Sequence, residues 1–104
     1  MIEVKPQEFT GNKVSFIATE NGEKTGTCQI ELDGYYVEIL SVTAPEDKSY
    51  ISELLLRSAL NYAANRNAYM AKTKLNDFLQ FPFEKSGEYY EADIPSLLAG
   101  SCGG

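Results

Sequence analysis

One stretch, residues 40–65, constrains the fold more than any other part of the chain. It reads LSVTAPEDKSYISELLLRSALNYAAN, which predicts the end of a buried strand, a short polar turn and a long helix from about residue 50 to 65. The apolar residues that recur at helical spacing are Ile51, Leu54, Leu55, Ala59, Tyr62 and Ala63. They form one broad apolar face, so we expect the helix to pack on a sheet, with Asp47 or Ser49 capping its first turn. A strand, turn and helix in this order form a joint at which many α/β proteins bind a ligand.

Alternating apolar residues before this stretch predict two strands joined by a tight turn. Residues 13–20, KVSFIATE, alternate and end in Asn21-Gly22, the strongest short hairpin signal. The return strand, residues 23–32, is apolar on one face and polar on the other. Its Cys28 alternates with core positions, so we expect this thiol to be a small buried hydrophobe.

A further turn and an edge strand complete the predicted meander. Asp33-Gly34 predicts a second two-residue turn of the same kind, leading into residues 35–42, YYVEILSV. That segment is apolar on nearly every position, which is typical of a central strand. At the other end, residues 2–5 alternate and stop at Pro6, which predicts a short edge strand.

The segments after the long helix predict the remainder of an α/β fold. Residues 68–75 predict a strand parallel to its predecessor, because the chain returns to the sheet from a helix. Residues 76–81 predict a helix of one or two turns, because Pro82 prevents a regular helix from continuing. Residues 83–94 predict a hairpin and residues 95–99 a last helical turn.

Size and composition restrict the class of protein. At 104 residues we expect a single domain, residues 1–104, of the α/β (α+β) class, with a mixed, mostly antiparallel sheet and a flexible tail at 100–104. The net charge of −6 with scattered lysines and arginines argues against nucleic acid and against an anionic membrane as partners. The chain has no histidine, which excludes a Ser-His-Asp triad and a His-ligated metal site. We expect no metal site, and we expect Cys28 and Cys102 to be free thiols in a reducing cytoplasm.

The predicted order of elements resembles the core of the GCN5-related N-acetyltransferase (GNAT) family, followed from about residue 13 to 94. Residues 20–26, ENGEKTG, are similar to the family's "dGxxvG" hairpin. Leu40-Ser-Val42 resembles the end of the family's fourth strand, and the spacing from Val42 to Ile51 matches the family's without a gap. Ile51, with Leu55 and Leu56, resembles the start of the helix that follows this strand in the family.

The resemblance implies acetyl-CoA as cofactor, held at the turn between strand and helix. The family's turn reads Q/R-x-x-G-x-G/A, because bare backbone N–H groups at a helix N-terminus must approach the pyrophosphate closely. By the same count, Asp47 stands at the basic position, and Tyr50 and Ser52 stand at the two later motif positions. An acid replaces the favourable charge, and side chains stand where the backbone should be bare. The sequence therefore predicts a degenerate cofactor loop.

Site residues follow from the resemblance where CoA or acetyl-CoA is bound. The implied cofactor contacts are Leu40, Val42, Lys48, Ser49, Tyr50, Ser52 and Asn76. Lys48 restores one positive charge, and Asn76 is equally well explained as a helix N-cap. Glu38 is the candidate catalytic base, because a buried carboxylate with a raised pKa can deprotonate an amine. The favoured alternative places Glu38 at the exposed end of the sheet or beside a lysine.

Two main functions compete, and a third is minor. The first is a non-catalytic binding or interaction module, forming a homodimer or binding a protein partner through an uncovered sheet face. The second is an active small acetyl-CoA-dependent N-acetyltransferase with an atypical cofactor loop. We favour the first, because the losses fall where the chemistry needs bare backbone. The minor alternative is a carrier protein, because Gly103-Gly104 resembles the end of ubiquitin-like carriers and Cys102 would add a thiol, although the element order is not that of the β-grasp fold.

Overall fold

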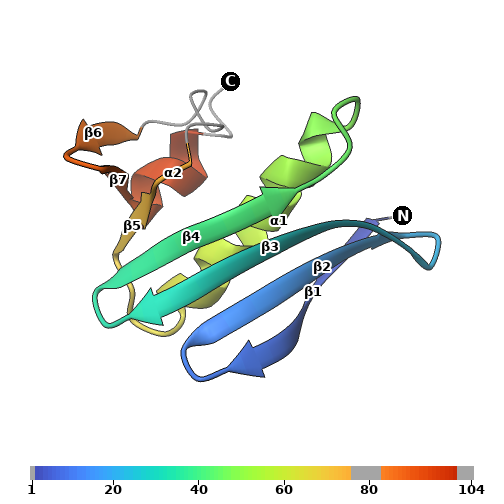
Figure 1. The fold of residues 1–104 in the computed structure, drawn as a ribbon, viewed down its shortest axis with the longest axis horizontal. Helices are drawn as coiled ribbons and strands as arrows, with labels where there is room; N and C mark the ends of the chain where they lie inside the picture. The colour runs from blue at the N-terminus through green and yellow to red at the C-terminus, as the bar shows by residue number, and fades with distance from the viewer. Residues whose placement is uncertain (1, 76–82, 101–104) are drawn as a thin grey trace.

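The computed structural model describes residues 2–75 and 83–100, without the side chains of Glu8, Phe9, Ser49 and Gly100. Within these described residues, seven strands and two helices follow one another (Figure 1). They are β1 (Ile2–Thr10), β2 (Lys13–Glu20), β3 (Glu23–Asp33), β4 (Tyr36–Thr43), α1 (Ser49–Ala64), β5 (Met70–Thr73), β6 (Glu84–Ser86), β7 (Tyr89–Asp93) and α2 (Ile94–Gly100).

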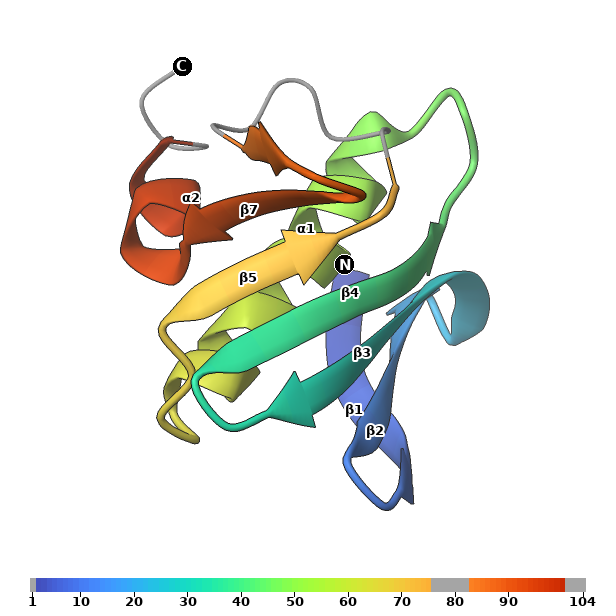
Figure 2. The same ribbon diagram turned by 60° about the vertical axis from the view of Figure 1, so that its left-hand side comes forward.

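All seven strands belong to one sheet, in the order β1-β2-β3-β4-β5-β7-β6. Only β4 and β5 run parallel, and every other neighbouring pair is antiparallel. Figure 2 shows β4 in the middle of the sheet, with α1 crossing behind it. The α/β (α+β) class, the mostly antiparallel sheet and the central position of the fourth strand are thereby confirmed.

The core lies between the sheet and α1, where alternate strand residues meet the apolar face of the helix. Fully buried side chains include Phe16, Ile30 and Ile39 from the strands and Leu55 and Leu56 from the helix. Burying one such side chain contributes about 1.5–3 kcal/mol relative to leaving it in water. The periodicity of residues 51–63 therefore predicted the packed face of α1, except that Leu54 is exposed.

Gly26 on β3 lets α1 come close to the sheet. A Cβ built on Gly26 would lie 2.7 Å from the Thr43 carbonyl oxygen and within about 3.2 Å of side-chain atoms of Ile51 and Leu55. Real Cβ atoms do not approach backbone oxygen this closely, so a larger residue would push β4 or the helix away. The second glycine of the 20–26 hairpin segment thus has a packing role.

The edge strand β1 is longer than its sequence predicts. It continues through Pro6 to Thr10, and its pairing with β2 shifts between Pro6 and Glu8. Proline lacks only an N–H, and at a sheet edge that N–H is not needed by a further strand. The prediction that the strand stops at Pro6 is therefore wrong.

The two predicted hairpin turns differ in kind. Asn21 and Gly22 both have positive φ, 55° and 85°, as a type I′ turn requires. In the next turn Asp33 pairs with Tyr36, so the two loop residues are Gly34 and Tyr35, and only Gly34 has positive φ. The prediction that Asp33-Gly34 forms a turn of the same kind is wrong by one residue.

The helix α1 matches its expected span, but its expected cap is wrong. The N-cap residue is Lys48, and its side chain makes no capping hydrogen bond. The N–H of Ile51 bonds instead to the Lys48 carbonyl oxygen at 2.9 Å. Asp47 lies before this N-cap residue and Ser49 is the first residue of the helix, so neither occupies the predicted cap position.

The later elements agree with the sequence where the structure describes them. The strand β5 is parallel to β4, and the β6–β7 hairpin and α2 follow as expected. Gly100 ends α2 rather than starting a tail. The expected helix at 76–81 and the expected tail beyond residue 100 lie outside the described residues.

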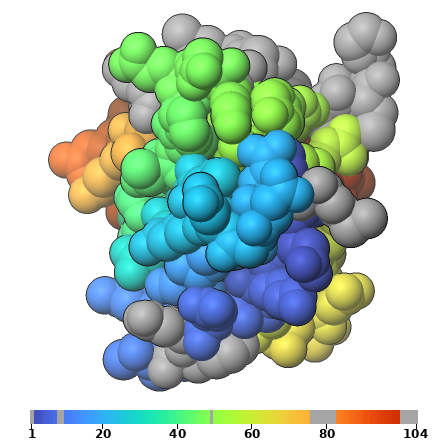
Figure 3. All heavy atoms as spheres, turned by 90° about the vertical axis from the view of Figure 1, so that its right-hand side faces the viewer, coloured from blue at the N-terminus to red at the C-terminus, as the bar shows by residue number. Residues whose placement is uncertain are grey.

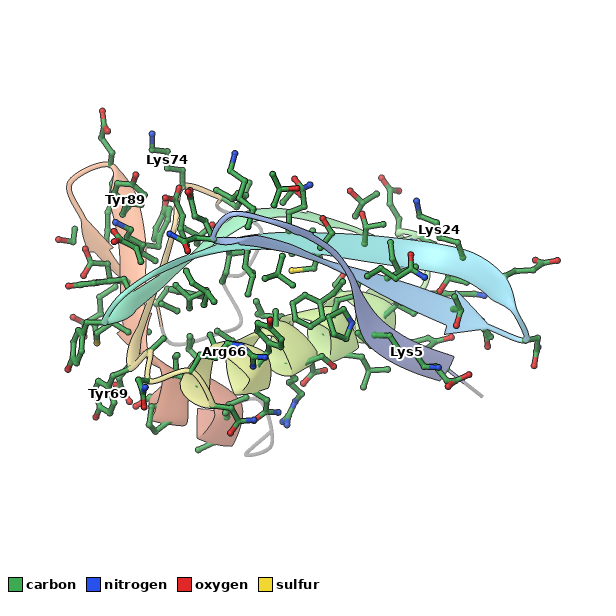
Figure 4. The ribbon with its side chains drawn as sticks, turned by 90° about the horizontal axis from the view of Figure 1, so that it is seen from below. Lys5, Lys24, Arg66, Tyr69, Lys74 and Tyr89 are labelled. Atoms are coloured by element: carbon green, nitrogen blue, oxygen red, sulfur yellow. The ribbon has the colours of Figure 1, made fainter. Side chains whose placement is uncertain are left out.

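One face of the sheet is covered and the other is not. Both helices lie on the same side, while Lys24, Lys74 and Tyr89 project from the opposite side (Figure 4). No described element packs on that opposite side, which we call the helix-free face. Among the described residues, no helix is long and apolar enough to span a membrane.

Candidate functional site

The candidate site begins where β4 and β5 separate. Their parallel pairing ends at Ile39 and Thr73, and beyond this point the two strands diverge (Figure 2). Thr73 is fully buried; its hydroxyl donates to the Ile39 carbonyl oxygen at 2.9 Å and accepts from the Leu75 N–H at 3.1 Å. One side chain thus satisfies a backbone group of β4 and one of the segment that follows β5, and it stabilises the point of divergence.

A β-bulge lies directly beyond this point. Ile30 pairs with Ile39 and Gln29 pairs with Ser41, so Leu40 is an extra residue on β4. A bulge bends its strand and re-aims the backbone, and bulges are frequent beside functional sites. Leu40 is half-buried, and the next candidate, Val42, packs against the core.

The turn after β4 leads into the first turn of α1. The Lys48 N–H donates to the Pro45 carbonyl oxygen at 3.0 Å, and this tight turn sets the direction of the helix. Ile51 is completely buried, which holds the first helical turn against the sheet. The N-terminus of α1 is therefore held in place by packing rather than by a side-chain cap.

Lys48, the only cation in residues 40–52, is bound by a carboxylate of the chain. Its Nζ lies 3.2 Å from Oε1 of Glu20, at the tip of the β2–β3 hairpin. The hydrogen bond that the Lys48 ammonium donates to Glu20, and then the negative charge of Glu20, raise the pKa of Lys48. Figure 3 views the molecule from the side where this hairpin and the turn before α1 lie.

Charge and side-chain bulk at this turn oppose an anionic ligand. Glu46 and Asp47 are exposed, and with Glu20 they give three carboxylates against the single ammonium of Lys48. The Tyr50 side chain is 47% exposed and projects from the first turn of the helix. A pyrophosphate needs bare N–H groups and a positive field, so these residues do not fit the cofactor group that the turn would have to hold.

Glu38 lies on the helix-free face, away from this turn. It is half-buried, and its direct neighbours across the sheet are Glu31 on β3 and Lys72 on β5. A lysine is thus placed beside Glu38, as the alternative prediction holds, yet no ion pair within the described part of the chain joins the two. The Lys72 Nζ lies instead over the rings of Tyr36 and Tyr89, 5.2 and 5.0 Å from their centroids.

The structure brings together only some of the predicted site residues. Leu40, Val42, Lys48 and Tyr50 follow one another around the point where the strands separate, whereas Asn76 lies outside the described residues. Sequence reasoning missed Glu20 and Thr73. The pairing of Glu20 with Lys48 joins positions 28 residues apart, so no local pattern predicts it. Thr73 could have been found, because it lies two residues after Ala71 and therefore on the core face of the predicted strand.

Comparisons with known proteins give matches of structure only. No protein-family model matches the chain, and no curated protein matches its sequence. Solved structures of acetyltransferases do match. The ribosomal-protein-alanine N-acetyltransferase from Escherichia coli superimposes with a TM-score of 0.72 at 9% identity, over 90% of this chain and 94% of that one.

Two further matches come from structures that contain a cofactor. The PaiA N-acetyltransferase from Thermoplasma acidophilum, in complex with coenzyme A, matches at a TM-score of 0.65 and 12% identity, over 79% of this chain and 61% of that one. A GNAT family acetyltransferase from Elizabethkingia anophelis, with acetyl-CoA bound, matches at 0.59 and 16% identity, over 69% and 63%. This chain therefore spans less than two thirds of both of these proteins.

Proposed function

This chain has the GNAT acetyltransferase fold, and from that premise we propose that it is a binding or interaction module whose acyl-CoA loop has degenerated. The observation that carries the proposal is the ion pair between Lys48 and Glu20. It engages the one cation that stands where a GNAT turn would meet a pyrophosphate. An incoming phosphate would have to displace Glu20 while facing Glu46 and Asp47.

The backbone at this turn supports the same proposal. The positions that a phosphate-binding turn leaves bare carry the side chains of Tyr50 and Ser52. The helix cannot retreat to make room, because Ile51 between them is fully buried. The fold thus keeps the joint of strand, turn and helix, while its ligand-binding chemistry is lost.

A calorimetric titration with coenzyme A tests this function. The wild-type chain is expected to give no binding heat at millimolar ligand. A motif-restored variant, carrying Asp47→Arg, Tyr50→Gly and Ser52→Ala, is expected to gain affinity because it regains a cation and bare backbone. Glu20→Gln is the matched control, since it frees Lys48 without changing the backbone. Submillimolar binding by the wild type that is lost on changing residues 47–52 would overturn the proposal.

The second candidate is an active N-acetyltransferase, and the bulge at Leu40 favours it. The separation of β4 from β5 and the bulge are both intact, so strand backbone remains available for a ligand. In this candidate Glu38 is the base, and the predicted contacts of acetyl-CoA are Leu40, Val42, Lys48, Ser49, Tyr50, Ser52 and Asn76. Release of the CoA thiol from acetyl-CoA in the presence of amines, abolished by Glu38→Gln, would establish it.

The remaining alternative, a carrier protein, concerns residues that the structure does not describe. A carrier role would depend on Gly103 and Gly104, and its test is adenylation by a partner enzyme that disappears when both are removed.

A cytoplasmic location is part of the proposal, and the buried, unpaired Cys28 thiol supports it. Burial raises the pKa of that thiol to about 12, so it is unreactive.

A further inference from the structure

A continuous row of charged side chains crosses the helix-free face. Strand register places its members directly opposite one another from β2 to β6, and all of them point away from the core. In spatial order they are Lys13, Glu31, Glu38, Lys72, Glu91 and Glu84. We call this set the charged row.

The charged row contains opposite neighbours, such as Lys13 with Glu31 and Lys72 with Glu38, and also like neighbours. Two pairs of glutamates, Glu31 with Glu38 and Glu91 with Glu84, stand directly opposite each other, and like charges in such positions are destabilising. None of the ion pairs between described residues includes a member of the row. The row therefore carries charges that a partner could match.

On the two sides of β4, corresponding positions of the charged row carry opposite charges. The strand β4 is fourth of seven in the sheet and carries Glu38. Moving outward by one strand, Glu31 on one side corresponds to Lys72 on the other. Moving outward again, Lys13 corresponds to Glu91. Opposite charges thus occupy symmetric positions, which is the condition for a face to bind its own copy.

We propose that a second copy of this chain packs on the helix-free face, related by a two-fold axis that runs parallel to β4 between the two sheets. This inference rests on the proposed function and names the partner of the interaction module. In the dimer, Glu31 pairs with the partner's Lys72, and Lys13 pairs with the partner's Glu91. Each pair occurs twice, so four opposite-charge pairs surround a single like pair, Glu38 with the partner's Glu38.

The same axis gives the largest overlap of the two sheets. It superimposes all seven strands, and two sheets stack about 10 Å apart with their strands within about 30° of each other. Tyr36 lies two residues before Glu38 on the same face, so it meets the partner's Tyr36 and adds apolar area. The molecule measures 38 × 33 × 22 Å, which leaves room for the roughly 800 Å² per partner of a stable interface.

Charge-reversal variants of Glu31 and Lys72 distinguish this dimer from a dimer that uses another surface. Glu31→Lys alone and Lys72→Glu alone each turn two attractive pairs into repulsive ones, which weakens the dimer on the order of a hundredfold. An equimolar mixture of the two variants restores both pairs and is expected to give the heterodimer. Glu38→Gln removes the like pair at the axis and is expected to strengthen association.

Sedimentation equilibrium over a concentration series, with thermal melts as a check on folding, measures these states. A wild-type dimer, two monomeric single variants and a dimer in their mixture are the expected results. A wild-type monomer at millimolar concentration would overturn the proposal, including a monomer that binds a lysine-rich peptide instead, and so would a dimer that the reversals leave unchanged. A dimer that also binds coenzyme A would defeat the proposed function while leaving this interface standing.

Discussion

The core beneath α1 and the turn that precedes α1 are neighbours, yet they differ in how well they match an acetyltransferase of this fold. Beneath the helix, Leu55 and Leu56 are fully buried and Gly26 leaves the space that close approach requires. In the turn, Lys48 is engaged by Glu20. Side chains such as Tyr50 stand there, where the resemblance predicts bare backbone. The difference teaches that the fold depends on packing, while cofactor binding depends on a few positions that packing does not protect.

Removing core volume beneath α1 is expected to have the largest effect. Leu55→Ala leaves a cavity in a fully buried site and should lower the free energy of unfolding by about 2–5 kcal/mol. Leu54→Ala is the matched control, because the neighbouring side chain is 39% exposed and should cost less than about 1 kcal/mol. Urea unfolding measures both values, and equal losses would contradict the assignment of the packed face.

Adding volume at Gly26 is expected to have the next largest effect. Gly26→Ala places a methyl group against the Thr43 carbonyl oxygen and should destabilise the chain by about 1–3 kcal/mol. Gly87→Asn is the control, because no atom lies near a Cβ there and asparagine tolerates its positive φ of 64°. A stable Gly26→Ala variant with an unchanged melting temperature would show that α1 does not need this close approach.

Changes in the turn before α1 should affect stability less than either core change. Glu20→Gln removes the charge that raises the Lys48 pKa. Because the folded pKa of Lys48 is the higher one, its contribution is complete below the unfolded pKa and is lost as pH rises through the folded pKa. We expect the wild type to lose slightly more stability than Glu20→Gln when melts are taken at increasingly alkaline pH. Parallel curves for the two proteins would argue against the ion pair in solution.

The smallest effect is expected at the start of α2, where a side chain does cap the helix. The Ser96 N–H donates to Oδ2 of Asp93 at 2.9 Å, and this bond lowers the pKa of Asp93. A lowered folded pKa means that the contribution is present above the unfolded pKa and is lost as pH falls through the folded pKa.

Asn in place of Asp93 separates capping from titration. Asp93→Asn keeps an acceptor for the Ser96 N–H, so its melting temperature should match the wild type near neutral pH and fall less on acidification. Asp93→Ala should melt lower than both at neutral pH. Melts between neutral and acidic pH measure the difference. Identical acid dependence in the wild type and Asp93→Asn would contradict the lowered pKa of Asp93, and an Asp93→Ala variant that melts with the wild type at neutral pH would refute the cap.

Local patterns were enough to predict most of the fold. Alternation in β2 and β3, the Asn21-Gly22 turn and the helical spacing from Ile51 onward all report on neighbours within a few residues. The predicted end of β1 was wrong, although its edge position was predicted. Pro6 stops a strand only where its missing N–H is needed, and at a sheet edge the strand continues past it.

The site was less predictable because its contacts are between distant parts of the chain. The motif positions at 47, 50 and 52 could be located by counting, but the partner of Lys48 lies on another hairpin. The charged row depends on five strand registers at once, including the shift between Ala18 and Thr19 in the pairing of β2 with β3. No pattern within a single segment contains that information.

The claim that this turn does not hold the cofactor is tested most directly by nuclear magnetic resonance. Backbone amide shifts are followed while coenzyme A is added to the ¹⁵N-labelled wild-type chain up to several millimolar. The amides of residues 48–52 report directly on phosphate contact at the N-terminus of α1. Unchanged shifts at these amides are the expected result. Saturating shifts there, together with shifts at Leu40 and Val42, would contradict it.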